Sequence, residues 1–158
     1  LNYSPAGLRA TFSTTRISDA QCLELGRKDG EGALSPERQK AIANLVYGGE
    51  WGKAHLGNRQ PGDGWLYRGR GAKQLTGRDN YADLNVLLQG DPDVLAHPEL
   101  VEAPDMGMRA ACRYWTRKGC NALADLDAIE KLTLAINGGT NGLDARKKAL
   151  VRAKVILL

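Results

Sequence analysis

Residues 57–81 read GNRQPGDGWLYRGRGAKQLTGRDNY, and this stretch decides the fold. Glycines recur through it and through the preceding residues from Gly48 onward, interleaved with tryptophan, tyrosine and arginine. Because glycine is unfavourable inside helices, residues 48–71 are predicted to be irregular rather than regular helix. Irregular segments in the middle of a domain often carry function. We therefore expect the functional site within residues 47–81.

Short helices are predicted before this segment. A capping box at residues 18–21 begins a helix that Gly26 can close. The Ser35-Pro36 pair begins another helix, since serine can cap and proline is favoured in the first turn; it is expected to end near Tyr47. The N-terminal part is therefore predicted to be helical.

Helices are also predicted after the segment, over residues 79–88 with a stop at Gly90, from Pro104 to before Gly119, over 125–136, and from about 143 to the end. The second of these, after Pro104, is expected to bury the residues that recur at helical spacing, which are Met108, Ala111, Cys112 and Trp115. The third, over residues 125–136, is expected to have one apolar face, made of Leu126, Ile129, Leu132, Thr133 and Ile136. With no repeat or linker, residues 1–158 are predicted to form a single, mainly α domain, with at most a small β-hairpin.

The composition is that of a folded globular protein, with 42% hydrophobic and 25% charged residues among 158. No apolar run approaches the roughly 20 residues of a membrane span, and the N-terminus shows no signal pattern, so membrane insertion is not expected. The net charge of +4 favours a polyanionic partner. Nucleic acid, an anionic cell wall and acidic lipid all satisfy that charge.

Cysteine and histidine are sparse. Cys22, Cys112 and Cys120 are too few for a disulfide framework and are predicted to be buried thiols. His55 and His97 stand far apart, outside any zinc-binding spacing. We expect no metal and no other cofactor.

The central segment combines aromatic rings, amides and a hydroxyl, including Trp65, Tyr67, Gln74 and Thr76. Sugar-binding sites use this combination, because aromatic faces contact the C–H side of a pyranose and amides satisfy its hydroxyls. One alternative is a tight-turn scaffold whose aromatics belong to the core. The residues alone leave both open.

A nucleic-acid interpretation starts from the basic residues of the same segment, which are Arg68, Arg70, Lys73 and Arg78. No helix-turn-helix, zinc-finger or phosphate-binding glycine loop accompanies them. The arginines could equally be paired within the fold. Nucleic acid is therefore not the expected partner.

The order of motifs resembles the bacterial and phage branch of family 19 glycoside hydrolases, with Pro-Gly-Asp-Gly, Tyr-Arg-Gly-Arg-Gly, Gln-Leu-Thr-Gly and Asn-Tyr in succession. Residues 135–143, AINGGTNGL, resemble the Ile-Asn-Gly-Gly element of that family. Residues 1–8, LNYSPAGL, resemble the segment that follows its second catalytic glutamate. The resemblance covers nearly the whole chain.

This resemblance implies a lysozyme-like fold and hydrolysis of β-1,4 bonds between N-acetylated amino sugars, with inversion. Thr76 resembles the hydroxyl that positions the attacking water, and Asn80 resembles its neighbour in that role. The residues that resemble groups of the sugar cleft are Trp65, Tyr67, Gln74, Asn137 and Arg146. Structural roles stay open, since Thr76 and Asn80 could cap the helix near Asp79 and Asn137 could end a helix.

The resemblance places the general acid in a His-Glu-Ser or His-Glu-Thr stretch and the second glutamate just before the Asn-Tyr segment. Both positions would precede Leu1, so we expect an N-terminally incomplete family 19 domain. Glu50 is expected on the surface, Asp63 in a turn and Asp79 at a helix start, so none is expected to replace the acids. A non-catalytic glycan-binding domain is the alternative.

The expected partner is a peptidoglycan or chitin oligosaccharide, and the expected state is a monomer. A phage endolysin would accumulate in the cytoplasm before release to the wall. An enzyme whose signal was lost with the N-terminus would be secreted. The resemblance does not separate these cases.

Overall fold

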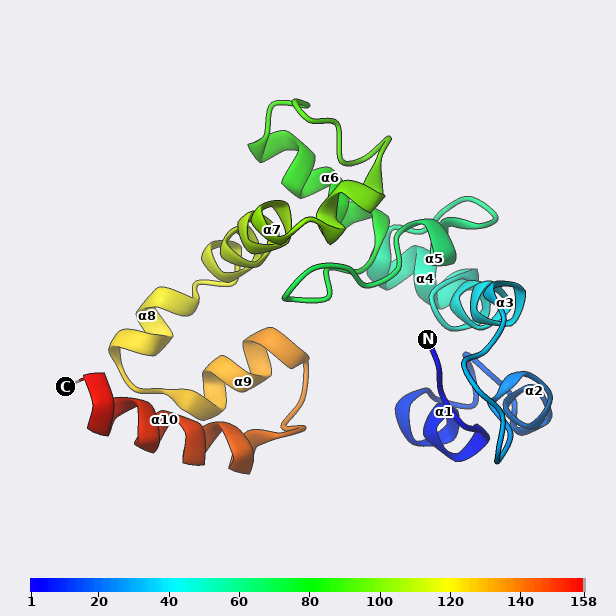
Figure 1. Cartoon of the computed structure of the whole chain (residues 1–158). Helices are drawn as coiled ribbons and strands as arrows, with labels where there is room; N and C mark the ends of the chain where they lie inside the picture. The colour runs from blue at the N-terminus through cyan, green and yellow to red at the C-terminus, as the bar shows by residue number, and fades with distance from the viewer. Residues whose placement is uncertain (158) are drawn as a thin grey trace. The chain divides into compact units, whose positions relative to one another are not determined.

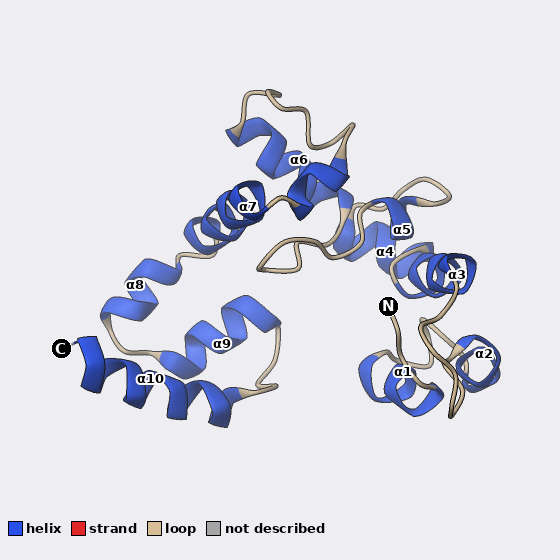
Figure 2. Ribbon diagram, viewed as in Figure 1, coloured by secondary structure: helices blue, strands red, loops and turns tan. Residues whose placement is uncertain are grey.

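The computed structural model describes residues 1–157, which are mainly helical (Figures 1 and 2). The elements in order are α1 Pro5–Thr11, α2 Asp19–Leu25, α3 Pro36–Val46, α4 Gly49–Leu56, α5 Asp63–Leu66, α6 Arg78–Leu87, the 3₁₀ helix η1 Pro98–Glu102, α7 Pro104–Arg117, α8 Cys120–Asp125, α9 Ile129–Asn137 and α10 Leu143–Leu157. The mainly α prediction is confirmed. Within the described range, the small β-hairpin is reduced to an isolated antiparallel bridge between Arg70 and Leu75.

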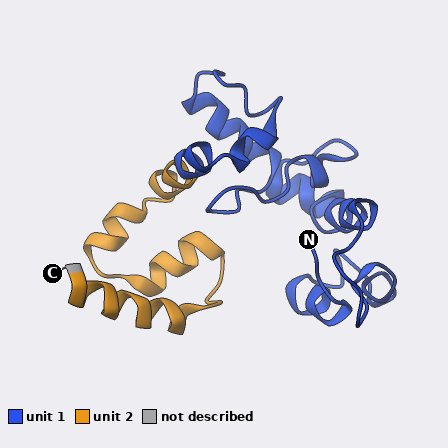
Figure 3. Cartoon of the chain, in the orientation of Figure 1, with its two compact units in different colours: residues 1–110 blue, residues 111–158 orange. Residues whose placement is uncertain are grey.

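Two compact units divide the chain, Leu1–Ala110 and Ala111–Leu158 (Figure 3). In the first unit, α1, α2 and α3 enclose one core cluster, made of Leu8, Phe12, Ile17, Cys22, Leu34, Ile42 and Val46. Further buried side chains lie between the end of α5 and η1, namely Tyr67, Leu75, Tyr81, Leu84, Val94 and Val101. The first unit therefore contains the whole of the glycine-rich segment.

The capped helices lie where the sequence predicts them. Ser18 accepts a hydrogen bond from the backbone N–H of Gln21, and the Gln21 side chain accepts one from the Ser18 backbone N–H, which makes the capping box of α2. Ser35 caps α3, with Pro36 in its first turn. A third helix of this kind, α1, was not predicted, although Ser4 and Pro5 begin it in the same way.

The prediction that residues 48–71 contain no regular helix is wrong, because α4 and α5 lie within them. Close packing explains the glycine at position 52: a Cβ there would lie 2.0 Å from the carbonyl oxygen of Tyr47. Asn58 ties the same carbonyl down, since its Nδ2 donates to it at 2.8 Å. Gly57 ends α4 in the left-handed conformation. Tertiary contacts thus offset the weak helix propensity of these glycines.

The second unit corrects the prediction of one helix over 125–136. The chain instead forms α8 and α9, separated by Asp127 with a φ of 52°. Leu126 falls in this break and is 77% exposed, so it does not share the buried face predicted for it. Gly138 ends α9 in the left-handed conformation, as expected of a helix stop.

The buried face of α7 also differs from the predicted one. Met106, Gly107 and Ala110 are buried, whereas Met108 is 57% exposed and Cys112 is exposed. The reason is a close backbone approach, because a Cβ on Gly107 would lie 3.1 Å from the Cα of Gly71. The buried-thiol prediction is therefore confirmed for Cys22 and Cys120 and wrong for Cys112.

Gly71 is expected to tolerate no side chain. It has a φ of 67°, and a Cβ would lie 2.8 Å from the Cα of Gly107 and 3.0 Å from the carbonyl oxygen of Val101. Gly30 has a φ of 75°, and a Cβ added there would meet no atom within 4 Å. A substitution at Gly30 therefore measures the cost of the backbone conformation alone. Gly30→Ala should cost about 1 kcal/mol, and Gly71→Ala about 1 to 3 kcal/mol more because of the clash. Urea unfolding of both variants measures this, and equal losses would contradict the packing argument.

No helix in the described part of the chain is long and apolar enough to cross a membrane. This finding concerns helices of residues 1–157 alone.

Candidate functional site

A tight loop at residues 70–75 carries one predicted site residue, Gln74, and Thr76 follows it directly. Arg70 and Leu75 exchange backbone hydrogen bonds of 3.2 and 2.9 Å, and the N–H of Gln74 donates to the carbonyl of Gly71 at 3.0 Å. Gln74 has a φ of 57°, a left-handed conformation that is uncommon outside glycine. The side chain of Gln74 stays exposed. A strained backbone at such a residue is typical of a functional position.

The buried side chain of Arg70 anchors the loop. It is 5% exposed, its Nε donates to Glu102 Oε1 at 2.9 Å, and its Nη1 donates to the carbonyl of Leu66 at 2.7 Å and to the hydroxyl of Tyr81 at 3.1 Å. Burial raises the pKa of Tyr81 although the guanidinium of Arg70 acts to lower it. Arg70 is therefore a structural residue that fixes the ends of the loop.

The other arginines of the segment also have partners in the fold. Arg68 lies with its guanidinium carbon 3.9 Å from the ring centroid of Trp65 and 3.5 Å, at Nη2, from Glu102. Arg78 lies 3.9 Å from Asp63. These pairings match the alternative of arginines paired within the fold, and they leave less free positive charge for nucleic acid than the sequence suggests.

A pocket of about 300 Å³ lies beside the loop. Its lining residues are Leu1, Tyr3, Gln39, Tyr47, Arg68, Gly69, Gln74 and Thr76. The structure thus brings two of the predicted residues, Gln74 and Thr76, into one hollow with side chains from the N-terminus and from α3. We call it the Thr76 pocket.

Thr76 is held by two hydrogen bonds, one from its side-chain hydroxyl and one to its backbone carbonyl. Its hydroxyl donates to the carbonyl of Gln74 at 2.8 Å, and Asn80 Nδ2 donates to the carbonyl of Thr76 at 2.7 Å. The N-cap of α6 is Gly77, with no side-chain capping hydrogen bond. The hydroxyl of Thr76 is therefore not a helix cap. Asn80 holds Thr76 in position through the hydrogen bond to its backbone carbonyl.

Gly69 lets the side chains of Gln74 and Thr76 pack closely against the backbone. A Cβ at Gly69 would lie 2.9 Å from Gln74 Oε1 and 3.1 Å from Thr76 Oγ1. The amide oxygen and the hydroxyl therefore converge over a residue without a side chain. A side chain at position 69 would therefore displace Gln74 or Thr76.

Tyr47 and Arg68 set the electrostatics of the Thr76 pocket. Burial raises the pKa of the Tyr47 hydroxyl, so Tyr47 keeps its proton at neutral pH. Burial lowers the pKa of Arg68 from its usual value, which is high enough that Arg68 stays charged. The pocket therefore presents hydrogen-bond donors and a positive charge.

Trp65 and Tyr67 do not line the Thr76 pocket. Tyr67 is 2% exposed, and its hydroxyl donates to the carbonyl of Leu95 at 3.1 Å. Trp65 is half-buried, and its backbone N–H donates to Asn44 Oδ1 at 2.9 Å. Their assignment to sugar binding stays a prediction from the resemblance, and the structure gives Tyr67 a place in the core.

Asn137 and Arg146 belong to the second unit, where they meet at one backbone carbonyl. Asn137, the last residue of α9, donates from Nδ2 to the oxygen of Asn141 at 3.2 Å, and Arg146 Nη1 donates to the same oxygen at 2.6 Å. Asn137 is exposed and Arg146 half-buried. The structure therefore brings this predicted pair together.

The three carboxylates considered from the sequence lie elsewhere. Asp63 accepts backbone hydrogen bonds from Arg59 and Gln60 at 2.9 Å, which confirms its role in a turn. Asp79 lies in the first turn of α6 and pairs with Arg59 at 2.9 Å, and Glu50 is exposed in the first turn of α4. No carboxylate lines the Thr76 pocket in the described part of the chain.

The sequence reasoning missed several residues of the Thr76 pocket, among them Tyr3, Gln39 and Tyr47. They come from segments 29 or more positions before Thr76 in the chain, and no local pattern joins them to it. Only the resemblance at residues 1–8 pointed to the N-terminal segment as part of the site.

Comparison with known proteins identifies the family. A protein of Haemophilus influenzae named "Glycosyl hydrolase family 19 domain-containing protein" is 40% identical over 157 residues, which cover 99% of this chain and 68% of that protein. No protein-family model matches the chain. The motif order of residues 57–81, the mainly α fold and this similarity over nearly the whole length agree, and the chain belongs to glycosyl hydrolase family 19.

Proposed function

We propose that this protein hydrolyses β-1,4 bonds between N-acetylated amino sugars of peptidoglycan or chitin, with inversion at the anomeric carbon. The proposed place of action is the cell wall, and the proposed active form is a monomer. The observation that carries the proposal is the pocket of about 300 Å³ that Gln74 and Thr76 line together, with the Gln74 amide oxygen and the Thr76 hydroxyl both packed against Gly69.

Thr76 would orient the attacking water. An inverting enzyme holds a water between its general base and the sugar, with the two carboxyl groups roughly 6.5 to 9.5 Å apart. The single proton of the Thr76 hydroxyl is committed to the carbonyl of Gln74 at 2.8 Å. Toward the pocket the hydroxyl is therefore an acceptor, to which a water donates one hydrogen while its lone pair faces the sugar.

Gln74 and Tyr47 would recognise the sugar. The Gln74 carboxamide offers both a donor and an acceptor, as an N-acetyl group requires, and its strained backbone holds it at the pocket. Tyr47 keeps its proton and adds a donor. Hydrogen bonds that are already oriented before binding cost little entropy when the substrate arrives.

The place of the general base also supports this function. By resemblance, the second glutamate of the family immediately precedes the segment that Leu1–Leu8 match, and Leu1 and Tyr3 line the Thr76 pocket. A base beside these residues would face the water that Thr76 orients. The resemblance matches neither the general acid nor the base to a residue within 1–158.

A second candidate function is glycan binding without hydrolysis. It is favoured by the absence of a carboxylate from the lining of the Thr76 pocket in the described residues. Binding and hydrolysis are separated by measuring both on the same protein, with calorimetry for the first and chromatography of cleavage products for the second.

Weak binding of N-acetylglucosamine oligomers, in the micromolar to millimolar range and tighter for longer oligomers, is expected of the 158-residue chain. Asn137→Ala should weaken it by about 1 to 3 kcal/mol, because the partner of a sugar polar group is lost. Titration calorimetry measures the change, and Asn121→Ala, at another exposed asparagine of the second unit, is the control. A chain that ignores these sugars and binds nucleic acid with a steep salt dependence would contradict the proposal.

A further inference from the structure

A second, larger cavity of about 610 Å³ lies in the first unit at the start of α4. Its lining shares no residue with that of the Thr76 pocket and consists of Thr15, Arg16, Asn44, Leu45, Gly48, Gly49, Glu50, Trp51 and His55. The volume is in the range of ligand-binding pockets. We call it the Arg16 cavity.

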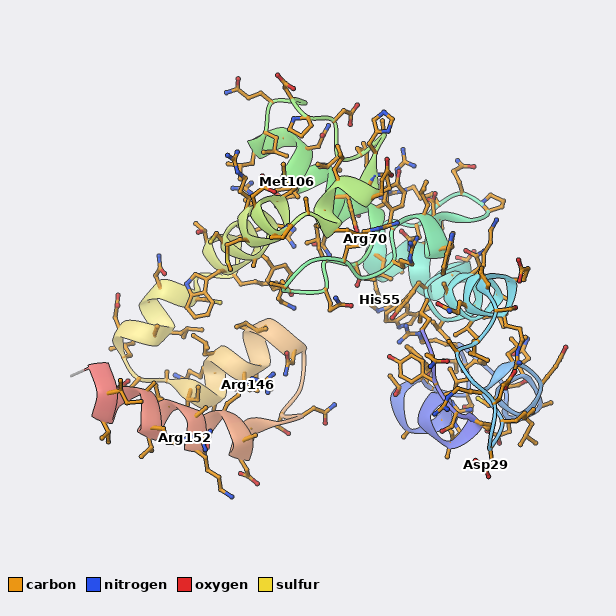
Figure 4. All side chains as sticks on the ribbon, viewed as in Figure 1. Asp29, His55, Arg70, Met106, Arg146 and Arg152 are labelled. Atoms are coloured by element: carbon orange, nitrogen blue, oxygen red, sulfur yellow. The ribbon has the colours of Figure 1, made fainter. Side chains whose placement is uncertain are left out.

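Arg16 is fixed in place within this cavity. Its Nε donates to the carbonyl of Val46 at 2.7 Å, and its guanidinium carbon lies 3.6 Å from the ring centroid of Trp51 and 4.9 Å from that of Phe12. His55, labelled in Figure 4, stacks on Trp51 with ring centroids 4.7 Å apart and planes 12° apart. The guanidinium is therefore held rigidly, with Nη1 and Nη2 not engaged by Val46.

The charge of Arg16 has no acidic partner among the residues that the structure describes. Six other arginines each pair with a carboxylate, namely Arg9, Arg38, Arg59, Arg68, Arg70 and Arg78. Burial lowers the pKa of Arg16, and no carboxylate acts to raise it. Desolvating a cation without a counter-ion is costly, so an anion entering the cavity would relieve that cost.

The surroundings of Arg16 are also basic. Glu50 is the acid that lines the cavity; it is exposed and forms no ion pair with Arg16. An adjoining cavity of about 530 Å³ shares Asn44, Gly48, Gly49 and Glu50 with it and adds Lys53 and Arg59. Because Arg59 is paired with Asp79, the charges left around the two hollows are Arg16 and Lys53 against Glu50, and this net positive charge favours an anionic ligand.

We propose that the Arg16 cavity binds a carboxylate of the peptide stem of peptidoglycan, which makes peptidoglycan rather than chitin the preferred substrate. The inference rests on the proposed function. Chitin is uncharged, whereas the lactyl group of muramic acid carries a peptide with several carboxylates. The two Nη groups of Arg16 match the two oxygens of a carboxylate, and a charge-assisted pair of this kind is among the strongest polar contacts.

The test uses three probes on the full 158-residue chain, by titration calorimetry at low salt. N-Acetylmuramyl-L-alanyl-D-glutamate carries two carboxylates and no amine, and its diamide is the neutral control. Chitotetraose reports glycan binding at the Thr76 pocket alone. We expect the diacid to bind at least about tenfold more tightly than the diamide.

Four variants assign the difference to the cavity. Arg16→Gln should abolish the preference for the diacid, and Arg152→Gln, which removes the same charge from α10, should leave it unchanged (Figure 4). Glu50→Gln should tighten diacid binding about twofold to threefold, because it removes the repelling charge. Glu50 is exposed, so this variant decides the matter even if Arg16→Gln does not fold. Glu24→Gln, at an exposed acid on α2, is its control.

The outcomes separate this inference from the proposed function. Equal binding of diacid and diamide by the wild type overturns the carboxylate site, whether or not chitotetraose binds. A preference for the diacid that depends on Arg16, without any binding of chitotetraose, supports the carboxylate site while the glycan pocket fails. Inorganic phosphate that binds more tightly than the diacid would overturn the carboxylate assignment in favour of a phosphate-bearing polymer.

Discussion

Residues 1–158 on their own are expected to hydrolyse glycans at least about a hundredfold more slowly than an active family 19 enzyme. A positioned general acid or base contributes typically about 10² to 10⁴ in rate, and no carboxylate of the described residues lines the Thr76 pocket. Clearing of permeabilised Gram-negative cells and chromatography of N-acetylglucosamine oligomers measure the rate. The longest natural form of the protein, assayed in parallel, is the reference.

Lysis by residues 1–158 at the rate of an active family 19 enzyme would contradict this expectation. It would show that an acid within the chain performs the reaction. Glu50 would be the first residue to replace, because Asp63 and Asp79 already accept hydrogen bonds from the backbone or from Arg59. Glu50→Gln would then abolish the lysis.

Thr76→Val is expected to lower kcat about a hundredfold in the longest natural form of the protein, with KM nearly unchanged. Valine keeps the volume of threonine but cannot accept a hydrogen bond from the water, and misplacement of a reactant by about 1 Å can cost that much. The Gln74 carbonyl also loses the donor 2.8 Å away, but that carbonyl belongs to an exposed residue that water reaches. Steady-state kinetics on a chromogenic chito-oligosaccharide separates kcat from KM.

Thr76→Ser is the matched control, since serine restores the hydroxyl without the methyl group. It should recover most of the lost turnover, whereas a packing role for Thr76 would leave serine and valine equally impaired or equally active. Thermal unfolding of each variant tests whether the fold is intact. An unchanged kcat in Thr76→Val would remove the water-orienting role.

The helices were predictable where a capping residue near in sequence marks their start. Ser18 and Ser35 cap helices through hydrogen bonds to residues three positions on, so the sequence alone contains the signal. The α4 helix was not predictable from the same rules, because its glycine at position 52 reflects a contact with the Tyr47 carbonyl. The break at Asp127 was missed for a related reason, since a positive φ at aspartate has no strong local signal.

The candidate site was predictable only in part. The motif order placed Gln74 and Thr76 side by side, and the structure brings both to one pocket. Tyr47 reaches that pocket from the end of α3, which depends on how the helices pack and not on the motif. The burial of Tyr67 likewise depends on packing, because the same residue type occurs in cores and in binding sites.

The left-handed backbone of Gln74 lowers the stability of the fold but keeps a carboxamide at the Thr76 pocket. A glycine there would relieve the conformation at a φ of 57°, which costs other residues about 1 kcal/mol or more. The same replacement would remove the carboxamide from the pocket. Selection for heat tolerance alone would therefore drive position 74 toward glycine, and selection for sugar turnover would hold it at glutamine, which is the familiar conflict between stability and activity at a strained site.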